Sequence, residues 1–217
     1  MLSMTLIIII ITCLISIIAF SNHKVLDDLI FWPPAISNRK QYYRFFTCGL
    51  IHADFIHLGF NMYSLYIFGE YVELKFLDLF GPHGRLFYLI MYVTALPICL
   101  LPTYAKNRDN YHYKSLGASG AVSAVVFAFI FLEPLRKLGL IFLPGDFMLP
   151  GFIFGLLYLG ISTYLDKKGG SSINHSAHIW GALFGISFLI VFGNIFGEYK
   201  PLQQFIDQVR YYFSGNG

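Results

Sequence analysis

The sequence predicts an all-α membrane protein built as a bundle of six transmembrane helices. Apolar residues make up 56% of the chain and charged residues only 12%, whereas soluble domains carry roughly 25% charged residues. Mean hydropathy is +0.62, and six apolar stretches approach the ~20 residues that a helix needs to cross a bilayer. These observations exclude an ordinary soluble domain and make the lipid bilayer the expected surroundings.

The six stretches follow one another along the whole chain. The first, at the N-terminus, is preceded by no Lys or Arg, and Ala19-Phe20-Ser21 is a poor cleavage site, so we interpret it as a retained helix rather than a signal peptide. The fourth and fifth are short, and the second is interrupted by polar residues. In order, the stretches are Met4–Phe20, Phe55–Phe76, Leu86–Tyr104, Ser119–Leu132, Pro150–Leu165 and Ala177–Phe196.

The connections between the stretches are of several kinds. The long connection from Ser21 to Asp54 mixes aromatic rings with basic residues, which favours a place on or partly in the headgroup region. The connection from Pro134 to Leu149 carries two basic residues and also suits the interface. We expect one domain over residues 1–217, with its motifs in 42–196 and a polar tail at 197–217 that contains an amphipathic turn, Leu202–Tyr212.

Charge and cysteine usage exclude several classes of function. The net charge of +3 is scattered and forms no basic arm, so nucleic acid is not an expected partner. The three cysteines show no paired spacing, so neither a disulfide framework nor a cysteine zinc site is predicted. With the N-terminus inside, the outside connections carry nine Lys and Arg and the inside ones six. The positive-inside rule thus mildly favours the opposite orientation.

Three polar clusters lie where lipid is expected, and polar side chains there default to a functional interpretation. His57 and Asn61 are four residues apart and share a helix face, with His52 just before them. Ser119 lies in a glycine-rich turn that opens an uncharged helix. His178 begins the last helix, above a small-residue surface that admits a close neighbour. The plainer alternative is that each cluster only packs helices together.

Together the clusters supply a nucleophile, a base and donors for an oxyanion. Ser119 would attack a carbonyl while His178 takes its proton and returns it to the leaving amine. His57, Asn61 and the backbone N–H of Ser119 would stabilise the developing negative charge. Because no carboxylate lies near His178 in the sequence, we expect a dyad rather than a triad.

These residues resemble the rhomboid family of intramembrane serine proteases. The resemblance covers about residues 42–185 and rests on three motifs in order: His-x4-His-x3-Asn at 52–61, Gly-x-Ser-Gly at 117–120, and Ala-His-x2-Gly-x3-Gly at 177–185. It implies a Ser119–His178 dyad and an oxyanion or substrate-binding site made by His57, Asn61, His52 and Gly117. It also implies membrane-protein substrates with one or several spans, and no cofactor.

The resemblance carries further expectations. His52 would stand at the mouth of the cavity, and Arg44 and Glu73 would be structural. The site would open to the extracytoplasmic side of a multi-pass protein, for which we expect a bacterial cytoplasmic membrane. The fifth helix would gate lateral entry of substrate. One departure stands out, since many relatives carry a tyrosine four residues after the nucleophile, stacked on the histidine, where this chain has Ser123.

Two other functions fit parts of the sequence. A catalytically silent relative would bind transmembrane segments without cutting them, but such proteins usually lose the serine or the histidine. A metal-dependent enzyme or transporter would use His52, His57, His175 and His178, yet the chain has no His-Glu-x-x-His pattern and no acidic ligand beside these histidines. We expect His175 to be an exposed loop residue and predict no metal site.

Overall fold

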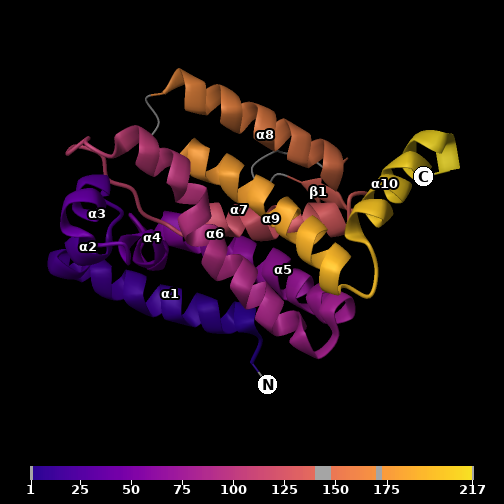
Figure 1. Ribbon diagram of the computed structural model, residues 1–217, viewed down its shortest axis with the longest axis horizontal. Helices are drawn as coiled ribbons and strands as arrows, with labels where there is room; N and C mark the ends of the chain where they lie inside the picture. Colours follow the sequence, from indigo (N-terminus) through magenta and orange to yellow (C-terminus); the bar gives the residue numbers. More distant parts are fainter. Residues whose placement is uncertain (1, 140–147, 170–172, 217) are drawn as a thin grey trace.

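The computed structural model describes residues 2–139, 148–169 and 173–216, and long helices dominate it (Figure 1). Each predicted stretch coincides with one long helix. By length and composition, α1, the run through α5 and α6, and α9 are long and apolar enough to cross a membrane, and α7 is a shorter apolar helix. The six are α1 (Met4–Ser21), α5 (Phe55–Phe80), α6 (Gly84–Asn107), α7 (Ser119–Leu132), α8 (Gly151–Lys168) and α9 (His175–Phe196).

Short elements fill the connections. Two short strands in the connection between α7 and α8 pair antiparallel, with Leu138 opposite Leu149. Residues 140–147, between these strands, lie outside the described residues. The predicted amphipathic turn in the tail is helical. These elements are α2 (His23–Leu29), α3 (Pro33–Arg39), α4 (Arg44–Thr47), η1 (Cys48–Leu50), η2 (Gly81–His83), β1 (Lys137–Gly139), β2 (Met148–Pro150), α10 (Pro201–Tyr211) and η3 (Tyr212–Asn216).

Helix α7 is the core of the bundle. Of its 14 residues, all but Ser119 and Val126 are buried, as expected for a helix that is apolar on every side. At 1.5 Å per residue it is about 21 Å long, shorter than the ~30 Å hydrocarbon core. Ser119 is the first residue of this short helix.

Helix α1 packs against α5 with its polar side. Its buried positions are spaced by three or four residues and include Thr5, Thr12 and Ser16, while Ile10, Leu14 and Ile17 on the other side are exposed. In a bilayer the outward isoleucine and leucine side chains face lipid, whereas small and hydroxyl side chains allow close contact between helices. The inverted pattern confirms that this first segment is part of the bundle.

The connection between α1 and α5 is held by Arg44. Its guanidinium is buried and donates hydrogen bonds to the carbonyls of Asp27 and Ile30, at 2.8 and 2.7 Å, and to Gln41 Oε1 at 2.6 Å. A buried cation satisfied by backbone carbonyls fixes the path of a loop that would otherwise lack regular hydrogen bonds. The structural role expected of Arg44 is therefore confirmed.

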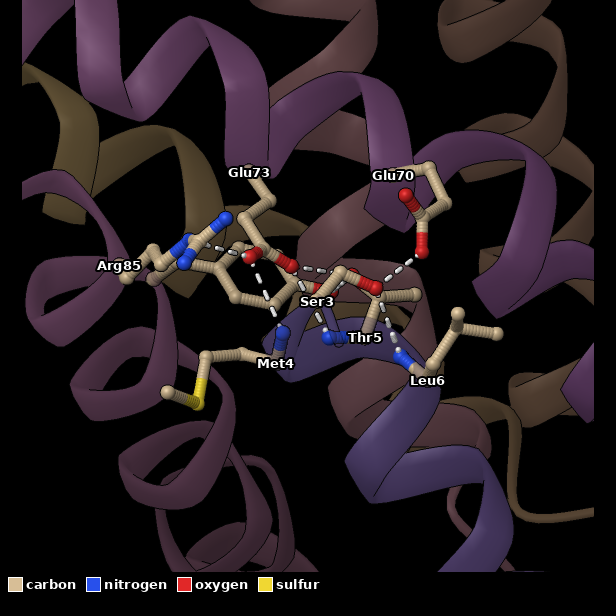
Figure 2. A network of polar contacts seen from close by, with 8 residues as sticks. Ser3, Met4, Thr5, Leu6, Glu70, Glu73 and Arg85 are labelled. Carbon is tan, nitrogen blue, oxygen red and sulfur yellow. Dashed lines mark hydrogen bonds and ion pairs between the residues drawn. The ribbon is translucent and has the colours of Figure 1, made fainter. Parts of the chain in front are cut away.

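Glu73 organises a polar network where α1 begins (Figure 2). Its carboxylate, on α5, accepts hydrogen bonds from the backbone N–H groups of Met4 and Thr5, both at 3.0 Å, and pairs with Arg85 Nε at 3.2 Å. The Ser3 side chain donates to Glu70 beside it. The first N–H groups of a helix have no intrahelical partner, so Glu73 caps α1 from another helix, which confirms its structural role.

Candidate active site

Ser119 is placed by the tight turn that precedes α7. Gly117 has φ +113°, which side chains rarely allow, and a Cβ there would lie 2.7 Å from His57 Cε1. Glycine is thus required twice, once for the backbone and once for the imidazole beside it. The Gly117 N–H donates to the Cys48 carbonyl at 2.9 Å. Gly117 therefore shapes the site, and its own N–H is already used.

Ser119 and His178 lie in direct contact. The distance from His178 Nε2 to Ser119 Oγ is 2.7 Å, that of a good hydrogen bond. His178 is in the first turn of α9, whose start is capped by Asn174, and Asn174 in turn accepts a hydrogen bond from Thr103 Oγ1 at 3.1 Å. The capped start of α9 thus fixes His178 beside Ser119, the first residue of α7.

The contact depends on an unusually close approach of α7 and α9. A Cβ added to Gly181 would lie 2.0 Å from the carbonyl oxygen of Gly120, and one added to Gly185 would lie 2.2 Å from that of Ala124. Both distances are impossible for a real side chain. The two glycines, one turn apart on α9, therefore set the backbone separation that lets His178 reach Ser119, as the small-residue pattern predicts.

His57 and Asn61 lie on the first two turns of α5, beside the turn at Gly117. Asp54 caps this helix by accepting from the His57 N–H at 2.7 Å. Asn61 is buried, and its amide donates one hydrogen bond to the His57 carbonyl at 3.0 Å. Since an amide NH2 carries two hydrogens, Asn61 keeps a second donor. The structure thus places His57 beside the turn at Gly117, whereas the Asn61 amide uses one of its donors within its own helix.

His52 does not stand at the mouth of a cavity, and that expectation is wrong. Its side chain is 1% exposed; Nδ1 lies 3.0 Å from Ser16 Oγ, and Nε2 accepts from the Ala118 N–H at 3.4 Å. Because Ser16 donates to the Leu50 carbonyl, Nδ1 must carry the proton. Burial, and then His57, lower the pKa of His52 to about 3. Both ring nitrogens of His52 are thus engaged, and Nε2 holds the backbone of Ala118, the residue before Ser119.

His175 is also placed differently from the expectation of an exposed loop. It is the first residue of α9, is 9% exposed, and its ring centroid lies 6.0 Å from that of His178. A polar cavity of about 390 Å³ adjoins it, between the ends of α6 and α8 and the start of α9. Its polar lining includes Lys106, His112, Lys114, Asp166, Asn174 and His175.

Tyr158 is a residue of the site that the sequence did not indicate. It comes from α8, and its ring lies nearly parallel to that of His178, with centroids 6.4 Å apart and an angle of 23°. Its hydroxyl lies 3.3 Å from Ser123 Oγ. No local motif marks Tyr158; a hint was the absence of a ring at Ser123, which left the histidine without the expected stacking partner.

In the described part of the chain, His178 has no carboxylate partner, and no group of three His, Cys, Asp or Glu residues is arranged to hold a metal ion. The fold and the dyad contact thus define a helical membrane protein with a serine–histidine pair where three helices meet. A model of the Rhomboid domain matches residues 39–195. The chain belongs to the rhomboid family, as its motifs indicate.

Curated relatives are organellar by name. The chain is 33% identical to RHOMBOID-like protein 12, mitochondrial, of Arabidopsis thaliana over 63% of this chain and 42% of that protein. It is 31% identical to Presenilin-associated rhomboid-like protein A, mitochondrial, of Danio rerio, over 73% of this chain and 40% of that protein. It is 32% identical to Rhomboid-like protein 11, chloroplastic, of Arabidopsis thaliana, over 69% of this chain and 52% of that protein.

The chain therefore spans about two-fifths to one-half of the length of these relatives. Their names place them in mitochondria and chloroplasts, so they give no support to the expectation of a bacterial membrane. The matched stretches are 149 to 163 residues long.

Proposed function

We propose that this protein is an intramembrane serine endopeptidase that uses Ser119 as nucleophile and His178 as general base. The observation that carries the proposal is the 2.7 Å contact between His178 Nε2 and Ser119 Oγ. A serine hydroxyl is a weak nucleophile until a base within hydrogen-bond reach removes its proton. Both residues also lie in the family motifs, and the family match includes them.

The reaction follows from this geometry. His178 Nε2 takes the proton as Ser119 Oγ attacks the peptide carbonyl, and the tetrahedral intermediate collapses when Nε2 returns that proton to the leaving amine. Water then attacks the acyl-serine, again with His178 as base, and releases the new carboxyl end. The candidate donors for the oxyanion are the first N–H groups of α7, the Asn61 amide and His57.

The substrate we propose is a transmembrane segment of another membrane protein. Peptide carbonyls in a membrane helix are engaged in internal hydrogen bonds, so a substrate must unwind locally before Ser119 can reach one. We expect segments with Gly, Ala or Pro near the cut to be cleaved faster than Leu-rich ones. Matched reporters that differ at two such positions measure this; equal rates would contradict the unwinding step.

The experiment that tests the function uses purified protein in liposomes with a single-span reporter. Ser119→Ala and His178→Ala should each abolish cleavage and labelling by a serine-reactive fluorophosphonate. Ser187→Ala and His83→Ala are the matched controls, because both residues are exposed and neither lies in one of the three motifs, and both should leave the rate unchanged.

The outcomes separate the candidate functions. Cleavage that survives Ser119→Ala would exclude the nucleophile. Reporter binding without cleavage or labelling would favour a catalytically silent membrane-helix binder. Loss of cleavage in a chelator, with recovery on adding metal, would favour the metal-dependent alternative instead.

A further inference from the structure

Tyr158 connects α8 with both helices of the dyad. Its ring stacks on His178 of α9 and packs on Phe127 of α7, with ring centroids 5.5 Å apart. Its hydroxyl contacts Ser123 Oγ, also on α7, at 3.3 Å. One side chain thus joins three helices directly beside the catalytic histidine.

The side of α7 that holds this ring is the side that carries the nucleophile. Ser119, Ser123 and Phe127 are four residues apart in succession, so they form one stripe along the helix. Ser119 contacts the edge of His178 at Nε2, while Ser123 and Phe127 hold the tyrosine that covers the face of the same imidazole. The stripe therefore controls His178 both directly and through Tyr158.

Helix α8 itself is lightly held. Its buried residues are only Gly151, Gly155 and Ser162, and four of its large apolar side chains are exposed, namely Leu156, Leu157, Ile161 and Tyr164. A Cβ on Gly155 would lie 3.3 Å from Phe127 Cε1, so α8 approaches α7 through a glycine one turn from Tyr158. Figure 1 shows α8 along the edge of the bundle, opposite α1. A helix with so narrow a contact is one that small forces can displace.

We propose that Tyr158 is the positioning residue of His178, and that the dyad is fully assembled only when α8 packs on α7 and brings this ring to the imidazole. The proposal rests on the proposed protease function, because an oriented base matters only if Ser119 is the nucleophile. Ser123 then has a role of its own, since its hydroxyl holds the tyrosine in place.

The physical reason is orientation. An imidazole can rotate about its side-chain bonds, and rotation carries Nε2 away from Ser119 Oγ. A nearly parallel ring on one face restricts that rotation, and an aromatic contact of this kind changes an equilibrium by up to roughly tenfold. Because rates fall steeply when reacting groups are misplaced, loss of the ring should lower the rate of the chemical step and leave the affinity for substrate unchanged.

The first test compares the two tyrosines of α8 by substitution. Tyr158→Leu should lower kcat for the single-span reporter roughly tenfold with KM unchanged, and should slow fluorophosphonate labelling of Ser119 to a similar extent. Tyr158→Phe keeps the ring but loses the hydroxyl contact with Ser123, so its kcat should fall less than that of Tyr158→Leu. Tyr164→Leu is the control, because Tyr164 is 63% exposed on the same helix. Rates are normalised to folded protein.

The second test moves α8 without touching Tyr158. Gly155→Leu should push the helix away from Phe127 and lower kcat as Tyr158→Leu does, whereas Gly160→Leu should not, since nothing lies within 4 Å of a Cβ there. The double variant Gly155→Leu/Tyr158→Leu should be no slower than the slower single variant, because both changes remove the same contact.

Each result decides between distinct conclusions. A Tyr158→Leu enzyme with wild-type kcat, or a Tyr164→Leu enzyme equally slowed, would overturn the positioning role. Additive losses in the double variant would overturn the link to α8 packing. A wild-type protein that neither cleaves any reporter nor labels at Ser119 would refute the protease function itself, and the positioning role with it.

Discussion

Polar groups at two places in this bundle are held in opposite ways. Around Glu73 several contacts converge: the carboxylate accepts from Met4 and Thr5 and pairs with Arg85 (Figure 2), and Thr5 Oγ1 donates on to Glu73 and lies 3.0 Å from Tyr88 Oη. Around Ser119, one hydrogen bond joins its hydroxyl to His178.

The difference fits the role that we propose for each place. A buried polar network that is fully satisfied fixes a structure, because any displacement breaks several bonds at once. A site in which donors remain unused is costly to fold but ready to stabilise charge that appears only during a reaction. We therefore expect changes at Glu73 to lower stability with little effect on catalysis, and changes around Ser119 to do the reverse.

The largest effect on stability is expected from Glu73→Ala. The substitution removes an ion-pair contact of Arg85 and leaves the backbone N–H groups of Met4 and Thr5 without their acceptor, which should cost about 3 kcal/mol of unfolding free energy. Thermal and denaturant unfolding in detergent measure this. Asp78→Ala, at an exposed position of the same helix, should change stability by less than ~0.5 kcal/mol. A Glu73→Ala protein as stable as wild type would break the comparison.

Asn61→Ala should show the converse behaviour. Removing one oxyanion donor typically lowers kcat about a hundredfold, or ~2.7 kcal/mol, and the amide here makes one hydrogen bond, to its own helix. The unfolding midpoint should stay close to that of wild type. Reporter kinetics and unfolding on the same preparations check both statements, and a loss of stability with unchanged kcat would assign Asn61 to packing.

The smallest effect should appear as a pH dependence centred on His52. Its pKa in the folded protein is about 3, against an ordinary 6.5. Burial lowers this pKa most, His57 lowers it further, and Asp54 raises it. The unfolded chain therefore binds the proton first, and stability present above pH 6.5 is lost as the pH falls. At pH 5 the loss should be about 2 kcal/mol.

His52→Gln provides the matched control for that measurement. Glutamine keeps hydrogen-bonding groups at the position but has no proton to take up, so its stability should change less between pH 7 and pH 5 than that of the wild type. If both proteins lose the same stability over this interval, the acid sensitivity arises elsewhere in the chain.

Much of the fold could be predicted because membranes impose simple rules on sequence. Runs of apolar residues mark helices, and the glycines of α9 predict a close neighbour, since helices in lipid associate through small residues. The pairing of Ser119 with His178 likewise followed from their motifs. Local patterns report such features well because each is determined within one or two turns of helix.

The errors and omissions have a different origin. His52 lies just before a helix and His175 at the start of one, so both look like exposed residues in the sequence, yet both are buried. Tyr158 lies 20 residues before His178 in a chain with 15 tyrosines, and nothing local marks it out. Burial and ring contacts of this kind depend on how α8 and the connections pack, which no short stretch of sequence encodes.

The central place of α7 has a consequence for the response of the protein to lipid. At a lipid surface, a helix about 9 Å shorter than the hydrocarbon layer would make the bilayer thin or the helix shift, at a fraction of a kcal/mol per ångström. Because α7 is buried among its neighbours, the longer outer helices meet the lipid instead. A change in bilayer thickness should therefore reach Ser119 only through the packing of those outer helices.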